Sequence, residues 1–228
     1  MKSKSAFTLA EVLITLGIIG IIAAMTLPSV VNKYQERVTV TKVKKFYSSI
    51  NQALLMAIKD HGYVDEWDFI ENDNEVEDGE DPLRSNNFFN YFKPYLKISK
   101  DCGNESGCIG SGVYKRLDGG NQVNYDSDKR YYKVILSDGS YMWMRRDVYN
   151  PNSPCKGSDG GYTNSCGAIW LDINGKNPPN TIGKDTFSFV ILKNTIGPHK
   201  IDDCKAGSEG WGCASYILTN GDMKYLQK

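Results

Sequence analysis

One carboxylate, that of Glu11, interrupts the most apolar part of the chain. Residues 7–31 contain no other charged side chain, so nothing within this run can neutralise it. A charged side chain inside a bilayer costs about 2.5–3.5 kcal/mol on insertion scales and is normally paired. The nearest cation that the chain can supply is a new amino group, created by cleavage between Ala6 and Phe7. Glu11 therefore predicts an ion pair with an amino terminus, in its own copy or in a neighbouring one.

A second interpretation of Glu11 is a helix cap. The spacing Thr8-x-x-Glu11 is that of a capping box, in which the two residues satisfy each other's backbone N–H groups. This accounts for Glu11 in an uncut chain. It does not explain why the apolar run starts abruptly at Phe7.

The six cysteines form three close pairs along the chain, each bracketing a Gly-rich loop: Cys102/Cys108, Cys155/Cys166 and Cys204/Cys213. An even count with loop-rich spacing beyond an apolar span favours disulfides in an oxidising compartment. Other connectivities are open, and local pairing is our prediction. Zinc is the alternative, but no C-x₂₋₄-C knuckle occurs and the two histidines stand apart.

Asp172, Asn174 and Asp185 form the only constellation that suggests a cofactor. Alternating oxygen side chains around a Gly turn can wrap Ca²⁺, which takes 6–8 oxygen ligands. The segment lacks the bidentate Glu of an EF-hand loop. The alternative is an Asn-Gly turn between two strands, with Asp185 as a cap. Calcium is thus a possible cofactor, and no other is indicated.

Motifs of known catalytic sites are missing from the sequence. There is no G-x-S-x-G, no H-E-x-x-H and no phosphate-binding G-x-x-x-x-G-K. We expect His61 and His199 at the surface and Trp143 and Trp170 in the core. Trp211, between two cysteines, could serve as a binding or subunit contact. The protein is not expected to be an enzyme.

Composition narrows the possible classes of function. The 228 residues include 27 Lys and Arg against 27 Asp and Glu, whereas nucleic-acid binders usually carry a basic surplus. Hydrophobic residues make up 40% and charged ones 24%, which excludes a wholly disordered chain.

The apolar run is long enough to span a membrane. As a helix, residues 7–31 would reach roughly 37 Å, against a bilayer core of about 30 Å. Lys2 and Lys4 precede it and would hold that end in the cytoplasm, with the remainder of the chain outside. A secretory signal peptide, cleaved after residues 23–25, and a simple membrane anchor are the alternatives. Gly17, Gly20 and Pro28 predict a kink or local melting of the helix.

The helix is expected to continue as an amphipathic segment over residues 32–59. Apolar side chains recur at steps of three to five: Tyr34, Val38, Val43, Phe46, Tyr47, Ile50, Leu54 and Ile58. Its basic residues could bind DNA or lipid head groups, and the alternative is a solvated face or a subunit contact. Residues 60–81 then contain eleven Asp or Glu and no Lys or Arg, which is typical of a surface loop that could face a neighbour's basic helix.

Strand patterns dominate the remainder. Residues 131–136 and 141–145 predict a hairpin, as do residues 215–218 and 223–226 around Asn220-Gly221. Residues 168–173 and 187–192 predict two further strands. A long helix followed by antiparallel strands is an α+β architecture.

The N-terminal residues resemble those of type IV pilins and type II secretion pseudopilins. The resemblance lies in a short leader with lysines, then Ala6-Phe7-Thr8-Leu9-Ala10-Glu11 and an uninterrupted apolar run. It implies cleavage between Ala6 and Phe7 by a prepilin peptidase, methylation of Phe7, and an assembly role for Glu11. Pro28 falls where helices of this family commonly have a proline. Ala6 departs from the family's usual glycine.

The resemblance also implies an organisation and a function. Residues 1–6 would be the leader, 7–31 the transmembrane or assembly half of the helix, 32–59 its amphipathic half, and 60–228 a head on a small antiparallel sheet. The protein would be stored in the inner membrane and assembled into a pilus or pseudopilus. Partners would be the peptidase, other pilin or pseudopilin subunits, membrane lipid, an inner-membrane platform and a cytoplasmic ATPase. Some pseudopilins carry a calcium site in a similar loop.

Two other functions remain open. One is a membrane-anchored or secreted ligand-binding module that uses the acidic stretch, the Trp211 loop or the calcium residues. The other is a DNA-capturing minor pilin. Removal of Lys2 and Lys4 would leave 25 basic residues against 27 acidic ones, so no nucleic acid is expected as a partner.

Overall fold

The structure is a computed structural model that describes residues 8–67, 82–110, 113–146 and 155–227. It divides into two compact units, Met1–Val38 and Thr39–Lys228. The predicted leader, the cleavage-site residues Ala6 and Phe7, and most of the acidic stretch lie outside the described residues.

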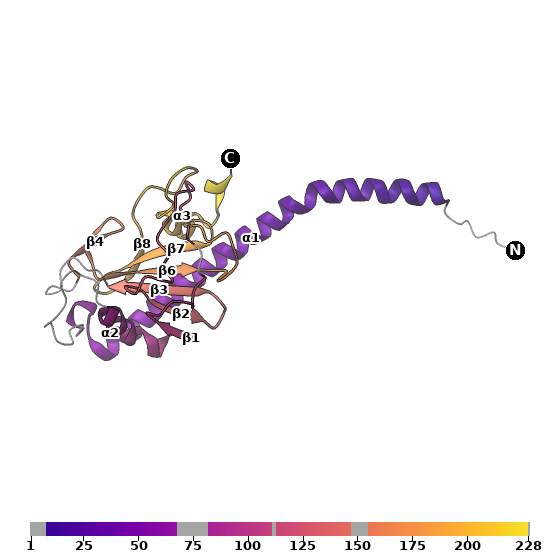
Figure 1. Cartoon of the computed structure of the whole chain (residues 1–228). Helices are drawn as coiled ribbons and strands as arrows, with labels where there is room; N and C mark the ends of the chain where they lie inside the picture. The colour runs from indigo at the N-terminus through magenta and orange to yellow at the C-terminus, as the bar shows by residue number, and fades with distance from the viewer. Residues whose placement is uncertain (1–7, 68–81, 111–112, 147–154, 228) are drawn as a thin grey trace. The chain divides into compact units, whose positions relative to one another are not determined.

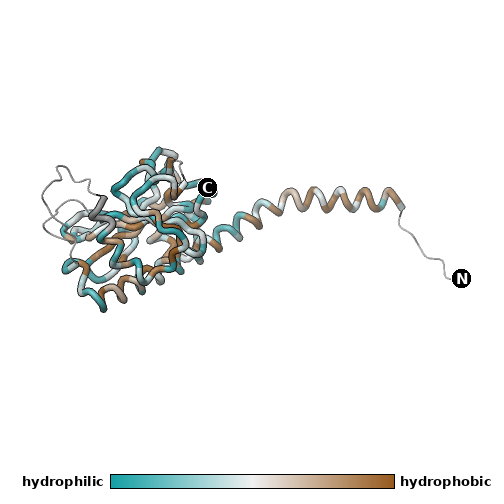
Figure 2. Tube along the Cα trace, turned by 60° about the horizontal axis from the view of Figure 1, so that its bottom comes forward, coloured by the Kyte–Doolittle hydropathy of each residue, from teal (hydrophilic) through white to brown (hydrophobic). Residues whose placement is uncertain are grey.

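The helix predicted for residues 7–59 is observed as α1, Leu9–His61. It runs through Pro28 without interruption, so the expected local melting is not observed. In the first unit, most side chains of α1 are exposed. Figure 2 shows that many residues of this part of the helix are hydrophobic.

The second unit is built on a six-stranded antiparallel sheet with the order β1-β2-β3-β6-β7-β8 (Figure 1). Its strands are β1 Ile98–Gly103, β2 Tyr132–Leu136, β3 Tyr141–Arg146, β6 Gly167–Asp172, β7 Thr186–Ile191 and β8 Ile196–Pro198. A separate hairpin pairs β4 Gly157–Asp159 with β5 Tyr162–Ser165. The α+β arrangement expected from the sequence, a long helix followed by an antiparallel sheet, is confirmed.

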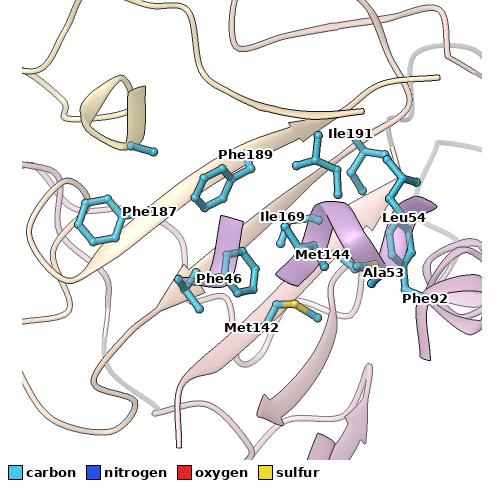
Figure 3. Close-up of a cluster of buried hydrophobic side chains, with 14 of the residues drawn as sticks. Phe46, Ala53, Leu54, Phe92, Met142, Met144, Ile169, Phe187, Phe189 and Ile191 are labelled. Carbon is cyan, nitrogen blue, oxygen red and sulfur yellow. The ribbon is translucent and has the colours of Figure 1, made fainter. Parts of the chain in front are cut away.

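One face of the sheet packs against the second half of α1. Figure 3 shows Phe46, Ala53 and Leu54 of the helix among side chains from the central strands, including Phe189 and Ile191. Successive strand residues point to opposite faces, so Met142 and Met144 join this core while Trp143 does not. The short helix α2, Pro82–Phe92, adds the buried rings of Phe88, Phe89 and Phe92.

The other face of the sheet is covered by loop residues between β1 and β2. The aromatic side chains of this second core come from the loop (Tyr114, Tyr125 and Tyr131) and from the strands (Tyr141, Trp143 and Trp170). Burial on both faces explains why every residue of β6 and β7 is buried. It also confirms the expectation that Trp143 and Trp170 are core residues.

The hairpin predicted near the C-terminus is wrong. Residues 213–220 form a helix instead, α3 Cys213–Asn220, followed by a single turn of 3₁₀-helix at Lys224–Leu226. Gly221 ends α3 in the left-handed conformation, with φ of 74°, and its N–H donates to Ile217 O. The Asn-Gly pair is therefore a helix C-cap and not a hairpin turn, because Cys213, Ala214 and Ile217 share one buried helical face.

Three disulfides are present in the head, and each joins neighbouring cysteines: Cys102–Cys108, Cys155–Cys166 and Cys204–Cys213. These are the local pairs expected from the sequence, and no cysteine is left free. The Cys155–Cys166 loop contains the β4–β5 hairpin, and the Cys204–Cys213 loop leads into α3. Each bridge thus closes a short loop, with sequence separations of 6, 11 and 9 residues between the paired cysteines.

Candidate functional site

The carboxylate of Glu11 caps the start of α1. Its Oε2 accepts hydrogen bonds from the Thr8 N–H and the Thr8 hydroxyl, each at 2.8 Å. The Glu11 N–H donates to Thr8 Oγ1 at 3.2 Å, which completes a capping box. In the sequence, Glu11 follows the Ala6–Phe7 bond by only four residues, and a free amine would arise at Phe7 on cleavage. The two interpretations of Glu11, a helix cap with Thr8 and an ion pair with a Phe7 amine, therefore both concern residues 7–11.

The helix after Glu11 exposes a continuous apolar surface. Its large side chains between residues 13 and 22 are between 53% and 63% exposed: Leu13, Ile14, Leu16, Ile18, Ile19, Ile21 and Ile22. Among the described residues, α1 is the one helix that is long enough and apolar enough to cross a membrane. An uncovered apolar surface of this extent marks a membrane or protein contact. Lipid or other copies of such a helix would cover it.

Two lysines on the basic face of α1 form polar contacts with residues of the head. Lys42 donates to the carbonyl oxygen of Ile173 at 2.6 Å, and Lys45 lies 3.9 Å from Asp138. These lysines line a surface groove of about 430 Å³ between α1 and the β2–β3 turn. The basic residues are thus not one uniform stripe, and this weakens the argument for a DNA-binding helix face.

The three residues predicted to bind calcium come together at the ends of β6 and β7. Asn174 Nδ2 donates to Asp185 Oδ2 at 3.1 Å, and the N–H groups of Asn174 and Gly175 donate to Asp172 Oδ1. Asp172 Oδ2 accepts a hydrogen bond from the Tyr114 hydroxyl at 2.9 Å. Both carboxylates are almost fully buried.

Burial also sets the charge state of this cluster. It raises the pKa of Asp172 to about 7, and the charge of Asp185 adds to the effect. Burial likewise raises the pKa of Asp185, although Thr181 and Asn180 donate backbone hydrogen bonds to it. The Oδ1 atoms of Asn174 and Asn180 have no hydrogen-bond partner in the described residues.

The oxygen chemistry of this cluster suits a hard cation. However, the described residues contain no group of three His, Cys, Asp or Glu that could hold a metal. Calcium binding by Asp172, Asn174 and Asp185 therefore stays a prediction.

A buried lysine, which the sequence analysis did not single out, fastens the covering loop to the sheet. Lys133 in β2 is fully buried, and its ammonium donates to three carbonyl oxygens, those of Asn104, Asp126 and Asp128, at 2.9–3.2 Å. The carboxylate of Asp126 in turn accepts N–H bonds from residues 107–109. A lysine in a strand pattern gives no signal of this role, because its three partners are backbone carbonyls of the irregular segment between β1 and β2, from 5 to 29 residues away.

Replacing Lys133 with methionine should destabilise the head by about 3 kcal/mol, since three carbonyls, two of them in buried hydrogen bonds, would lose their donor. Urea unfolding of the purified full chain measures the effect. The matched control is Lys97→Met, at an exposed lysine. Equal midpoints for the two variants would show that the three hydrogen bonds contribute little.

The structure places the two histidines differently from each other. His61 is exposed, as expected, but the surface position expected for His199 is wrong, because the residue is 5% exposed. It follows the edge strand β8, and its ring stacks on Trp211 with the centroids 6.0 Å apart. Trp211 is therefore partly buried and is not a free loop-tip side chain.

Comparison with known families supports the N-terminal interpretation. Residues 1–27 match the prokaryotic N-terminal methylation motif, the prepilin cleavage motif of type IV pilins and pseudopilins. Residues 29–109 match a family of unknown function (DUF6613), which covers the rest of α1, α2 and β1. No curated protein and no solved structure matches the chain.

The motif and the exposed apolar helix point to one class of protein. They support a processed subunit of the type IV pilin-like or pseudopilin kind, a class of structural proteins. The motif implies processing by a prepilin peptidase, anchoring in a membrane and assembly with other pilin subunits.

Proposed function

We propose that the protein is a structural subunit of a type IV pilus-like or type II secretion filament. Prepilin peptidase cuts between Ala6 and Phe7, and the apolar half of α1 then packs against the same helix of other subunits. The observation that carries this proposal is an exposed apolar helix that follows directly on a prepilin motif. The head faces outward from the filament.

Packing of helices must provide most of the cohesion of the filament. Lipid tails are as apolar as leucine, so a helix that leaves the bilayer gains nothing from the hydrophobic effect alone. Burial of an exposed Leu or Ile side chain is worth about 1.5–3 kcal/mol relative to water. Contact with neighbouring helices must therefore replace the lipid that surrounds these side chains. Gly17, Gly20 and Ala23 are small residues that allow a close approach.

The role of Glu11 changes on cleavage. In the uncut chain its carboxylate is occupied by Thr8. After cleavage the amine of Phe7 offers a positive charge near the same carboxylate, and a neighbouring subunit offers another. A charge that is costly in an apolar bundle then becomes an ion pair that sets the register between subunits.

The head lies outside the cytoplasm in this proposal. Three disulfides are typical of an oxidising compartment, and Lys2 and Lys4 favour a cytoplasmic N-terminus. The inner-membrane platform and the cytoplasmic ATPase would supply the force for assembly.

Mass spectrometry of the protein isolated from its cells tests the proposal. We expect an N-terminal peptide that starts at Phe7 and carries one methyl group, with three intact disulfides in the same molecule. A chain that starts after Ala24 would instead indicate a cleaved signal peptide. A chain that retains Lys2 and Lys4 in every fraction would contradict processing altogether.

A further inference from the structure

His199 is a buried titratable side chain for which pilus assembly provides no role. It is 5% exposed, and neither of its ring nitrogens has a hydrogen-bond partner within the described part of the chain. A neutral imidazole always carries one N–H, so this donor is unsatisfied. An unsatisfied buried donor is costly, and a protonated ring would have two of them.

Two disulfide-bounded loops enclose this ring. On one side lies the turn of the β4–β5 hairpin, which belongs to the Cys155–Cys166 loop. A Cβ at Gly160 would lie 2.8 Å from Cγ of His199, and Lys200 N–H donates to Gly160 O at 2.7 Å. The hairpin turn thus approaches the ring so closely that only glycine fits.

The Cys204–Cys213 loop forms the opposite wall. Trp211 stacks on the imidazole with an interplanar angle of 19°. Its backbone N–H donates to Asp203 Oδ2 at 3.0 Å, and Gly212 N–H donates to Asp203 Oδ1. His199 is therefore in van der Waals contact with both loops, and it forms no hydrogen bond to either of them.

The charged groups around the ring are Asp159 of the hairpin, Asp203, which directly precedes the Cys204–Cys213 loop, and the neighbouring Lys200. Burial lowers the pKa of His199, whereas the carboxylates of Asp159 and Asp203 act in the opposite direction and do not compensate. Asp203 is already occupied by two backbone N–H groups. The Lys200 ammonium lies over the ring of Tyr162, 4.1 Å from its centroid.

We propose that His199 is a pH-sensitive latch between the two loops. The neutral ring packs between Gly160 and Trp211 and holds the loops together. The protonated ring requires water or a carboxylate at both nitrogens, and it obtains them by moving out from between the loops. The disulfides limit the motion, so the loops separate while each stays tethered to the sheet. In a head exposed outside the cell, this device would expose Trp211 in acid.

The direction of the effect follows from linkage. A histidine whose pKa is lowered in the folded state contributes its full packing free energy to stability when the pH is above the usual histidine pKa of 6.5. The contribution is lost as the pH falls below 6.5 towards the folded-state value. Loop separation is thus expected on acidification and not on alkalinisation.

Carbon-13 NMR of the imidazole rings tests the first step directly. The chain contains only two histidines, so the full-length protein in detergent micelles, labelled at histidine Cε1, should give two resolved signals. We expect His199 to titrate below 6.5, the usual value for a histidine side chain. A His199 signal that titrates at or above 6.5 would overturn the proposal without any variant.

Hydrogen exchange tests the release of the loops. The reporting amides are Lys200, Trp211 and Gly212, each of which donates a hydrogen bond at the latch. Between pH 7.5 and pH 5, we expect their protection, corrected for intrinsic exchange, to fall by about tenfold, which corresponds to about 1.4 kcal/mol in the free energy of local opening. Protection in β6 and β7 should stay unchanged.

Two variants separate the latch from general acid loosening. His199→Phe keeps an aromatic ring that cannot be protonated, so protection at the three amides should not depend on pH. His61→Phe is the matched control and should behave like the wild type. An equal loss of protection in His199→Phe and in the wild type would overturn the proposal, as would unchanged protection in the wild type.

Discussion

Replacing Glu11 with glutamine is expected to leave the protein in the membrane and to block its assembly into filaments. Glutamine preserves a capping box with Thr8 but removes the charge, so this variant separates the two roles of Glu11. If the ion pair with an amino terminus is the essential contact, Glu11→Gln and Glu11→Ala should fail equally. We expect the yield of sheared filaments to fall by about tenfold or more, which corresponds to about 1.4 kcal/mol or more per subunit contact.

The measurement compares membrane and sheared fractions by immunoblot. Glu36→Gln, in the same helix but beyond the apolar run, is the matched control and should assemble normally. Filaments at wild-type levels from Glu11→Gln but not from Glu11→Ala would show that helix capping is the role of Glu11. Normal filament yields from both variants would show that Glu11 has no role in assembly.

Replacing Asp172 with asparagine is expected to stabilise the head at pH 8 and to have little effect at pH 4. The folded-state pKa of Asp172 is raised from 3.8 to about 7, so the folded state binds a proton that the unfolded state releases. This contribution is complete below pH 3.8 and is lost as the pH rises to 7. A shift of about three units corresponds to at most about 4 kcal/mol, and we expect about half of that.

Asp185→Asn is the contrasting variant. The Asp185 carboxylate accepts hydrogen bonds from the Asn180 and Thr181 N–H groups and from the Asn174 side chain. An asparagine NH₂ would face these donors, so this change should destabilise the head at both pH values. Urea unfolding of the full chain at pH 4 and pH 8 measures both variants. Identical pH profiles for the wild type and Asp172→Asn would refute the assignment of the raised pKa.

The same experiment examines the predicted calcium site. Calcium that binds Asp172, Asn174 and Asp185 should raise the unfolding midpoint of the wild type at pH 8, because it neutralises two buried carboxylates. Asp172→Asn should lose most of this increase. An equal increase in the variant, or none in the wild type, would contradict calcium binding at these residues.

The two buried titratable sites respond to acid in opposite directions. Protonation of Asp172 favours the folded head, whereas protonation of His199 loosens two loops at its edge. Acid can therefore leave the sheet intact or more stable while the Cys155–Cys166 and Cys204–Cys213 loops open. Global unfolding reports the first effect and local hydrogen exchange reports the second.

Local patterns explain what could be predicted from the sequence. The length of α1, the β2–β3 hairpin and strands β6 and β7 follow from the periodicity and turn residues of contiguous segments. The three disulfide pairs are close in sequence, so short loops bring them together. α3 was mistaken for a strand because its eight residues are too few to show a helical period, and Gly221 suits either a turn or a cap.

Long-range contacts explain what could not be predicted. The burial of Lys133 depends on carbonyl groups of a loop, including that of Asn104, 29 residues away. The burial of His199 depends on the β4–β5 hairpin turn at Gly160, which lies far away along the chain, and on Trp211. No pattern around these residues distinguishes them from an exposed lysine or histidine.

The sequence by itself determined the two features on which the proposed processing and anchoring rest. A prepilin motif and a candidate membrane span are read from consecutive residues, and their chemistry depends on the order of charges and apolar side chains. Only the tertiary structure decided which polar groups of the head are buried away from water and which protein groups replace water as their hydrogen-bond partners. The free energy of a buried charge depends on neighbours that the fold brings from distant positions, and one-dimensional spacing does not record them.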